Sequence, residues 1–351
     1  MKSKVIIVYN RLFHYRIPIW NILSQYCDLT VAYSFGDKPK DIECNFETLY
    51  LPVRKMSKFV IHKCNIKKLC SEYDVVIGYG DIAWLKLSLL PLMSKQKVVF
   101  HTLGVSASYD KGFDEHKEWD KIRCWFYKKA SAIVFYTSYP IDKYYKMGIS
   151  KEKMFVAPNT VAVIPTQNNV KKDSILMIGT LYKAKGLQAL LDVYLCLKNE
   201  CKLPILNIIG DGPDYEMVRQ WIVENQMEDK VKLRGAIYDI EEKANYFSRA
   251  YAVISPKQAG LTVQESMGYG VPFITTKNAI TGGEVLSIHN GIDGVLMDSV
   301  DELPVILKDI SENPEKYIEM GVRAKEFYNG NLTPEIMAKG LWNAVQYALN
   351  S

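Results

Sequence analysis

The 351-residue sequence lacks the features that mark several classes of protein. It has no apolar run of about 20 residues, the length that a membrane-spanning helix needs. Its seven cysteines are odd in number and include no CxxC spacing, so neither a disulfide framework nor a zinc site is indicated. Reduced thiols in the cytosol are the simpler interpretation. The first apolar run, at residues 5–9, is too short for a signal peptide and predicts a strand.

The chain also lacks a strong excess of charge of either sign. Its net charge is +5 and its pI is about 8.6, which is too weak and dispersed to predict nucleic-acid binding. This balance is compatible with an anionic ligand or with an anionic membrane surface. With 48% apolar and 24% charged residues, the composition is that of a globular enzyme, and the length predicts two domains.

Several catalytic motifs are absent as well. There is no D-x-D triplet, whose paired carboxylates hold a divalent ion on a diphosphate. There is no G-x-S-x-G nucleophile elbow and no G-x-x-x-x-G-K-[ST] phosphate loop. The first predicted strand–helix turn, residues 9–14, lacks G-x-G-x-x-G, which disfavours a dinucleotide cofactor.

What the sequence does contain is an alternation of short β-branched runs with longer amphipathic stretches. Apolar runs of four or five residues suit strands buried on both faces of a parallel sheet, and the alternation predicts two doubly wound α/β domains. The predicted strands are 5–8, 75–77, 98–100, 132–136 and 154–157, followed by 175–178, 205–209, 231–233, 252–254 and 272–275. The predicted helices include 186–199, 214–225 and 334–348.

The boundary between the halves is predicted at residues 158–173. This stretch contains two prolines, four asparagine or glutamine residues and little periodicity, which is typical of an interdomain linker. We therefore expect domains at 1–163 and 173–332 and a terminal helix in 333–351. Residues 105–119 are polar and predict either a mobile loop near a cleft or a plain solvated loop.

Two glycine-containing turns are candidate phosphate sites. The first, residues 179–186, follows a predicted strand and opens a helix, and Lys185 adds a positive charge. An ordinary turn with a solvated lysine is the alternative. In the second, residues 255–274, Gly260 permits close approach of a ligand, and Glu265 could accept hydrogen bonds from a ribose diol. A capping box between Thr262 and Glu265 would explain that pair, although not the surrounding glycines.

These turns are parts of a wider resemblance. The C-terminal half resembles the retaining GT-B glycosyltransferases of family 4, the glycosyl transferases group 1. The matching blocks are Gly179…Lys185-Gly186, then residues 208–212 (IIGDG), residues 231–235 (VKLRG) and residues 260–274. The N-terminal half resembles the family more loosely, through Tyr15-Arg16, residues 101–104 (HTLG) and Pro158-Asn159.

The resemblance implies a GT-B fold, in which two Rossmann-like domains face a cleft and a C-terminal helix packs back on the N-terminal domain. It further implies transfer of a sugar, with retention and without a metal or other cofactor, from a nucleotide-sugar to a saccharide or lipid-linked saccharide acceptor. The setting would be cytoplasmic assembly of surface polysaccharide or glycolipid, with peripheral attachment to the inner face of the membrane left open. Lys55, Lys58, Lys63, Lys67 and Lys68 could supply a basic patch for that attachment or form a solvated helix face.

The same resemblance assigns roles to individual residues. Catalytic roles fall on His101, Lys185 and Glu265: the histidine faces the donor sugar, the lysine stabilises the departing diphosphate, and the glutamate holds the ribose. His101 could equally be structural, and Arg16 could be a surface arginine. The donor-binding residues would be Gly179, Thr180, Lys183, Ile237, Lys257, Gly260, Leu261 and Thr262, and the acceptor-binding residues Tyr15 and Arg16.

Two positions depart from the family pattern. Its phosphate-clamping arginine falls on Thr180, and the first glutamate of its E-x7-E block falls on Lys257. We expect Lys257 or Lys183 to supply the missing positive charge. The alternatives are another GT-B enzyme, such as a sugar-nucleotide epimerase, and a partner subunit that keeps the fold without turnover.

Overall fold

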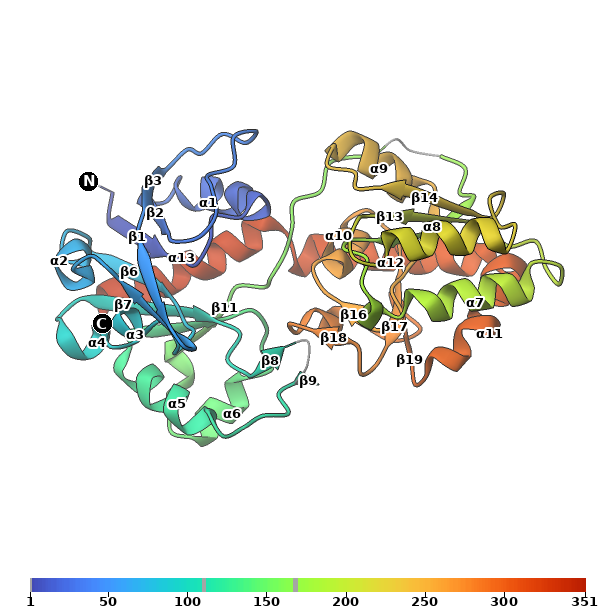
Figure 1. The fold of residues 1–351 in the computed structure, drawn as a ribbon. Coiled ribbons are helices and arrows are strands. Elements are labelled where there is room, and N and C mark those ends of the chain that lie inside the picture. Colours follow the sequence, from blue (N-terminus) through green and yellow to red (C-terminus); the bar gives the residue numbers. More distant parts are fainter. Residues whose placement is uncertain (1, 109–111, 167–169) are drawn as a thin grey trace. The chain divides into compact units, whose positions relative to one another are not determined.

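The computed structural model describes residues 2–108, 112–166 and 170–351 and divides the chain into two compact units (Figure 1). Unit 1 comprises Met1–Ser106, Asp114–Ala162 and Leu332–Ser351, and unit 2 comprises Ala107–Phe113 and Val163–Asn331. The passage from unit 1 to unit 2 at residues 162–163 lies inside the predicted linker. Residues 167–169 of that linker and residues 109–111 of the predicted loop lie outside the described residues.

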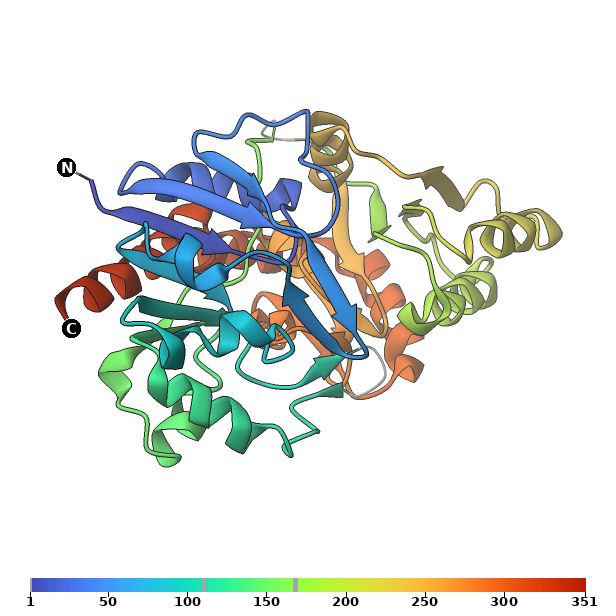
Figure 2. The same ribbon diagram turned by 60° about the vertical axis from the view of Figure 1, so that its left-hand side comes forward.

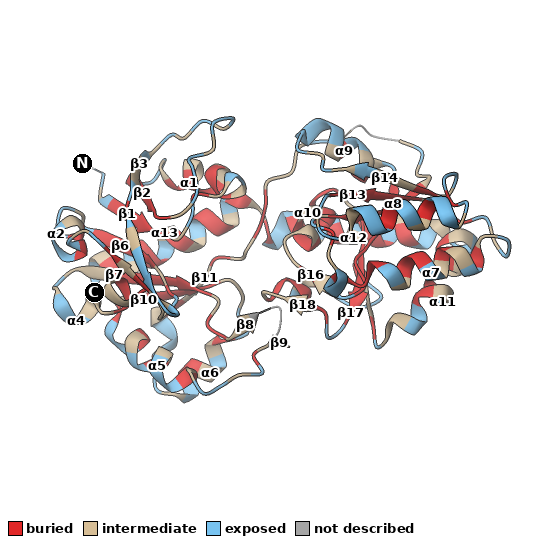
Figure 3. Cartoon of the chain, in the orientation of Figure 1, coloured by how far each residue is buried: buried red, intermediate tan, exposed pale blue. Residues whose placement is uncertain are grey.

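Unit 1 is built on a seven-stranded parallel sheet in the order β11-β10-β7-β6-β1-β2-β3. The strands are β1 (Lys4–Val8), β2 (Asp28–Tyr33), β3 (Glu47–Tyr50), β6 (Val75–Tyr79), β7 (Lys97–Thr102), β10 (Ala132–Phe135) and β11 (Met154–Val156). Figure 2 shows the blue and cyan strands side by side. The central strands are buried on both faces, as their uninterrupted apolar runs predict (Figure 3).

One face of this sheet is covered by α1 (Ile17–Leu23) and by the last helix, α13 (Pro334–Asn350). Helix α13 buries Met337, Leu341 and Val345 in the core of unit 1. Gly340 permits this close packing, because a Cβ there would lie 2.3 Å from the carbonyl oxygen of Val156. The other face is covered by α2 (Ile66–Cys70), α3 (Leu85–Ser88), α4 (Leu90–Met93), α5 (Asp120–Lys129) and α6 (Ile141–Lys146).

Unit 2 is built on a six-stranded parallel sheet in the order β14-β13-β12-β15-β17-β19. The strands are β12 (Ser174–Ile178), β13 (Ile205–Ile209), β14 (Val231–Gly235), β15 (Ala250–Ile254), β17 (Phe273–Thr276) and β19 (Gly294–Met297). The longer helices are α7 (Leu187–Leu197), α8 (Tyr215–Glu224), α9 (Ile240–Ser248), α11 (Leu303–Glu312) and α12 (Pro314–Asn331). The predicted pair of doubly wound domains is thereby confirmed, with the terminal helix on the first.

Several short elements were not predicted. Strands β2, β3 and β19 were missed, as were β4 (Val53–Met56) and β5 (Phe59–His62), which form an antiparallel pair. Inside the predicted loop, β8 (Ala107–Ser108) and β9 (Gly112–Phe113) cluster with unit 2, where they contact β18 (Ile280–Thr281). Among the described residues no helix combines the length and apolar character needed to cross a membrane.

Candidate functional site

A pocket of about 250 Å³ opens in unit 2 where β12 and its neighbour β15 end. The carboxyl ends of adjacent strands are where doubly wound sheets place their ligands. The lining residues come from both glycine-containing turns: Ile178, Gly179, Thr180, Tyr182, Lys185, Ser255, Gln258, Gly260, Leu261, Thr262 and Phe273. The structure thus brings together six of the predicted site residues, Gly179, Thr180, Lys185, Gly260, Leu261 and Thr262.

Lys185 is the only charged side chain among the described residues that line this pocket. It is only 4% exposed, and its ammonium group donates a hydrogen bond to the carbonyl oxygen of Ile178 at 3.0 Å. Burial lowers its pKa to about 8, because the charged form loses hydration. The alternative of a solvated lysine is wrong, and the buried cation is available to an anion entering the pocket.

The turn that carries Lys185 depends on glycine. Gly179 has a φ of 107°, and a Cβ there would lie 2.8 Å from the Nζ atom of Lys185. Beneath it, a Cβ on Gly210 would come within 2.1 Å of the carbonyl oxygen of Gly179. The block at residues 208–212 therefore packs directly against the first turn, because only glycine at position 210 lets the two loops lie this close.

Glu265 lies beside this pocket without lining it. Its Oε1 atom is 2.5 Å from the Nζ atom of Lys243 on α9, and both side chains are largely buried. Helix α10 (Thr262–Gly268) begins where the sequence predicts, but its N-terminus has no side-chain cap hydrogen bond. The capping-box interpretation of Thr262 and Glu265 is therefore wrong, and an unpredicted lysine holds the glutamate.

The remaining predicted donor residues lie outside the pocket lining. Lys183 and Lys257 are exposed, and Ile237 is half-buried in the loop after β14. Lys257 contacts the first turn through its main chain, with its N–H donating to the carbonyl oxygen of Lys185 at 3.0 Å. The side chain predicted to replace the missing positive charge thus does not line the pocket, whereas its neighbour Gln258 does.

In unit 1, His101 lies at the end of β7 within a group of tyrosines. It is 3% exposed, its Nε2 atom has no hydrogen-bond partner among the described residues, and its ring lies 4.6 Å from that of Tyr136. Burial and the charge of Arg16 hold its pKa well below the ordinary value, so the imidazole is neutral. The hydroxyl groups of Tyr9 and Tyr136 are hydrogen-bonded to each other nearby.

Arg16 joins two of the sequence blocks that resemble the family. Its Nη2 atom donates to Asn159 Oδ1 at 2.6 Å, and its Nη1 atom to Met337 Sδ at 3.0 Å. The guanidinium also lies over the rings of Tyr15 and Tyr136, at 5.4 Å in each case. The surface interpretation of Arg16 is wrong, since the residue is 4% exposed. Tyr15 itself is half-buried beside it.

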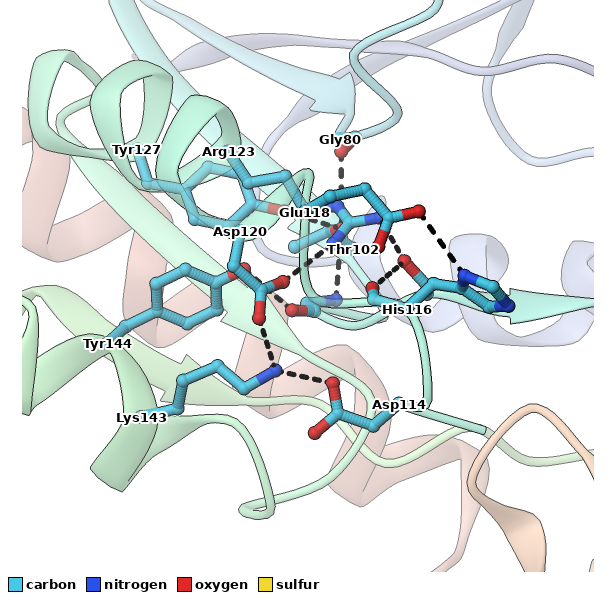
Figure 4. A network of polar contacts seen from close by, with 12 residues as sticks. Gly80, Thr102, Asp114, His116, Glu118, Asp120, Arg123, Tyr127, Lys143 and Tyr144 are labelled. Atoms are coloured by element: carbon cyan, nitrogen blue, oxygen red, sulfur yellow. Dashed lines mark hydrogen bonds and ion pairs between the residues drawn. The ribbon is translucent and has the colours of Figure 1, made fainter. Parts of the chain in front are cut away.

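A polar network in unit 1 was missed altogether (Figure 4). Lys143 bridges two buried carboxylates, at 2.5 Å from Asp114 and 2.9 Å from Asp120. Arg123 extends the network from Asp120 to the hydroxyl of Ser106, at 2.8 Å for each contact. The network thus includes Ser106 and Asp114, both of which belong to unit 1.

Comparison with known proteins gives a family match for the second half of the chain. Residues 163–327, just under half of the chain, match the family described as glycosyl transferases group 1. An uncharacterized glycosyltransferase of Haemophilus influenzae is 25% identical over 173 residues, which is 48% of either chain. The N-acetyl-alpha-D-glucosaminyl L-malate synthase of Bacillus anthracis is 28% identical over 155 residues, 43% of this chain and 39% of that one. The matches therefore span less than half the length of these curated relatives.

Solved structures extend the likeness of fold to the whole chain. The complex of Anabaena HepE with UDP superposes with a TM-score of 0.74, at 15% identity, over 98% of this chain and 99% of that one. The lipopolysaccharide outer core galactosyltransferase WaaB gives a TM-score of 0.67 at 18% identity, over 97% and 98% of the two chains. The fold is that of the GT-B glycosyltransferases, and the family match across its second half supports a GT-B glycosyltransferase of group 1.

Proposed function

We propose that this protein transfers a sugar from a nucleotide-sugar donor to a saccharide or lipid-linked saccharide acceptor, with retention of configuration and without a metal. The observation that carries the proposal is the buried ammonium of Lys185 in a pocket whose described lining contains no carboxylate. A diphosphate is the part of such a donor that this charge suits. The likeness of fold to HepE, solved with UDP and with UDP-glucose, agrees with this assignment.

In the proposed reaction, the bond between the sugar carbon and the diphosphate oxygen breaks, and the electron pair stays on that oxygen. Lys185 stabilises the negative charge that grows there, and it does so strongly because water is excluded around it. The acceptor hydroxyl forms the new bond to the sugar carbon, and its proton passes to the departing diphosphate. Glu265 and the main chain near Ile237 are proposed to hold the ribose and the base.

The first experiment is a binding screen with UDP, GDP, ADP, dTDP and CMP in the presence of EDTA. Saturation at about 100 times the dissociation constant stabilises a protein by about 2.7 kcal/mol, which a thermal shift detects. We expect one nucleotide to shift the unfolding temperature, Lys185→Ala to abolish that shift, and Lys339→Ala, an exposed lysine of unit 1, to leave it unchanged. No shift with any nucleotide would contradict the proposal.

A partner subunit without turnover is the second candidate. It is favoured by Thr180 in the pocket wall, at the family's arginine position, and by the exposed side chain of Lys257 outside that wall. Nucleotide binding combined with no hydrolysis or transfer of the donor sugar would support this candidate. Conversion of the donor into a second sugar nucleotide would instead identify an epimerase.

We further propose that a lipid-linked acceptor is met at the inner face of the cytoplasmic membrane. On unit 1, a hollow of about 550 Å³ is bordered by Lys67, Leu92, Met93 and Lys95, and both apolar side chains are 42% exposed. Cations beside exposed apolar groups suit an anionic lipid surface. The protein should sediment with phosphatidylglycerol vesicles more than with phosphatidylcholine vesicles, and replacing Lys67 and Lys95 by glutamine should reduce that difference. Replacing Leu92 and Met93 by serine should weaken binding to both kinds of vesicle.

A further inference from the structure

Two neutral polar side chains of the pocket, Ser255 and Gln258, take no part in the proposed contacts with the diphosphate, the ribose or the base. Ser255 follows β15 and is 3% exposed, and its Oγ atom has no hydrogen-bond partner among the described residues. Gln258 is half-buried and lines the same pocket. A buried hydroxyl without a partner costs free energy, so a ligand that supplies one gains that energy on binding.

The main chain between Ser255 and Gln258 is held by hydrogen bonds to three other segments. The carbonyl oxygen of Pro256 accepts from the N–H and the hydroxyl of Thr276, at 3.1 and 3.0 Å. Lys257 donates its N–H to the first turn and accepts from the N–H of Ile280 at 2.8 Å. Gln258 then begins β16 (Gln258–Ala259), which pairs with β18. Gln258 thereby lines the pocket, whereas Lys257 is exposed and does not line it, and a Cβ on Gly186 would lie 3.0 Å from the Cγ atom of Lys257.

The chemistry of the pair differs from that of Lys185. A hydroxyl and a primary amide each donate and accept hydrogen bonds, as every sugar hydroxyl does. A Cβ placed on Gly260 would lie 3.9 Å from the amide nitrogen of Gln258, so this amide lies over the glycine of the second turn. A diphosphate held at Lys185 would therefore leave its attached sugar within a wall that carries neutral groups only.

We propose that Ser255 and Gln258 bind the hydroxyl groups of the donor sugar, and that Gln258 determines which sugar is accepted. This inference rests on the proposed function of the pocket as the donor site. A carboxylate at this point would only accept hydrogen bonds, whereas the amide also donates one to a group such as a ring or acetamido oxygen.

The test separates nucleotide binding from sugar binding. Dissociation constants for UDP and UDP-glucose, and for GDP and GDP-mannose, are measured by calorimetry for the unaltered protein and for Gln258→Ala, Gln258→Glu and Ser255→Ala. Gln188→Ala is the matched control, because that glutamine is exposed on α7. For the nucleotide that binds, we expect each pocket variant to weaken the sugar nucleotide about five- to tenfold, the size of one neutral hydrogen bond, and to leave the free nucleotide unchanged.

The possible outcomes distinguish this inference from the proposed function. Failure of the unaltered protein to bind any nucleotide refutes the donor pocket, and the roles of Ser255 and Gln258 fall with it. Normal UDP binding combined with unchanged UDP-glucose binding in the variants overturns this inference alone. Equal weakening of both ligands also overturns it, because the side chains would then support the pocket rather than recognise the sugar.

Discussion

Raising the pH through the pKa of Lys185 should weaken donor binding, because the diphosphate needs the protonated lysine. In the free protein burial lowers this pKa from 10.5 to about 8. Near pH 7 the ammonium form dominates, whereas near pH 9 roughly one molecule in ten retains the proton. The affinity for a ligand that requires this proton should therefore fall about tenfold between these pH values, which corresponds to about 1.4 kcal/mol.

The assay is calorimetry with UDP-glucose, whose diphosphate diester does not change its charge over this range. The matched control is Lys172→Met: burial also lowers the pKa of Lys172 to about 8, but its ammonium group binds the carbonyl oxygen of Ala250, at the opposite ends of the strands. This variant should keep the pH dependence, and Lys185→Arg should remove it. Affinity that stays constant up to pH 9 in the unaltered protein would refute an electrostatic role for Lys185.

The lowered pKa of Lys185 also affects the stability of the fold. Raising the pH weakens donor binding, but it increases the free energy of unfolding. Between about pH 8 and 10.5 the unfolded chain holds a proton on residue 185 that the folded chain has released. The contribution of this group to the free energy of unfolding therefore rises with pH through that window. Bound donor reverses the trend, so the thermal shift that the donor produces should shrink as pH rises.

Three further predictions concern stability and the ribose site. Lys143→Met should lower the free energy of unfolding by about 3–5 kcal/mol in urea titrations, because it leaves the buried carboxylate of Asp114 without a cation and that of Asp120 with Arg123 alone; a loss below about 1 kcal/mol would contradict this. Gly340→Ala should cost about 1–3 kcal/mol through its contact with β11, whereas Gly330→Ala, with open space around it, should be neutral or stabilising. Lys243→Ala should change nucleotide affinity by releasing Glu265, and an unchanged affinity in calorimetry would show that the pair is structural.

The sequence predicted the strands best where burial on both faces leaves no polar position, as in β1 and β12. It missed β3 and β4, in which no position is buried, and it missed β2, whose buried run is interrupted by the polar Thr30. Lys185 was identified because its glycine-bounded turn is a local pattern. That Lys257 does not line the pocket was not predicted, because the position of its main chain depends on hydrogen bonds to segments far away in the sequence.

Side-chain contacts between residues that lie far apart in the chain could not be predicted from the sequence, for a related reason. The pairing of Lys243 with Glu265 requires that α9 and α10 pack together, and no spacing in the sequence encodes that contact. The contacts of Arg16 with Asn159 and Met337 join segments from both ends of unit 1. Resemblance to a family marked such residues as notable without revealing which neighbours they contact.

The position of α13 has a consequence for the order of folding during synthesis. Its apolar face completes the core of unit 1, although it is synthesised after unit 2. Multidomain chains usually fold from the N-terminus onward, but here the described core of unit 2 is complete before that of unit 1. Until residues 334–350 emerge, this face of the first sheet lacks one of the two helices that cover it, so part of its apolar surface stays exposed to solvent.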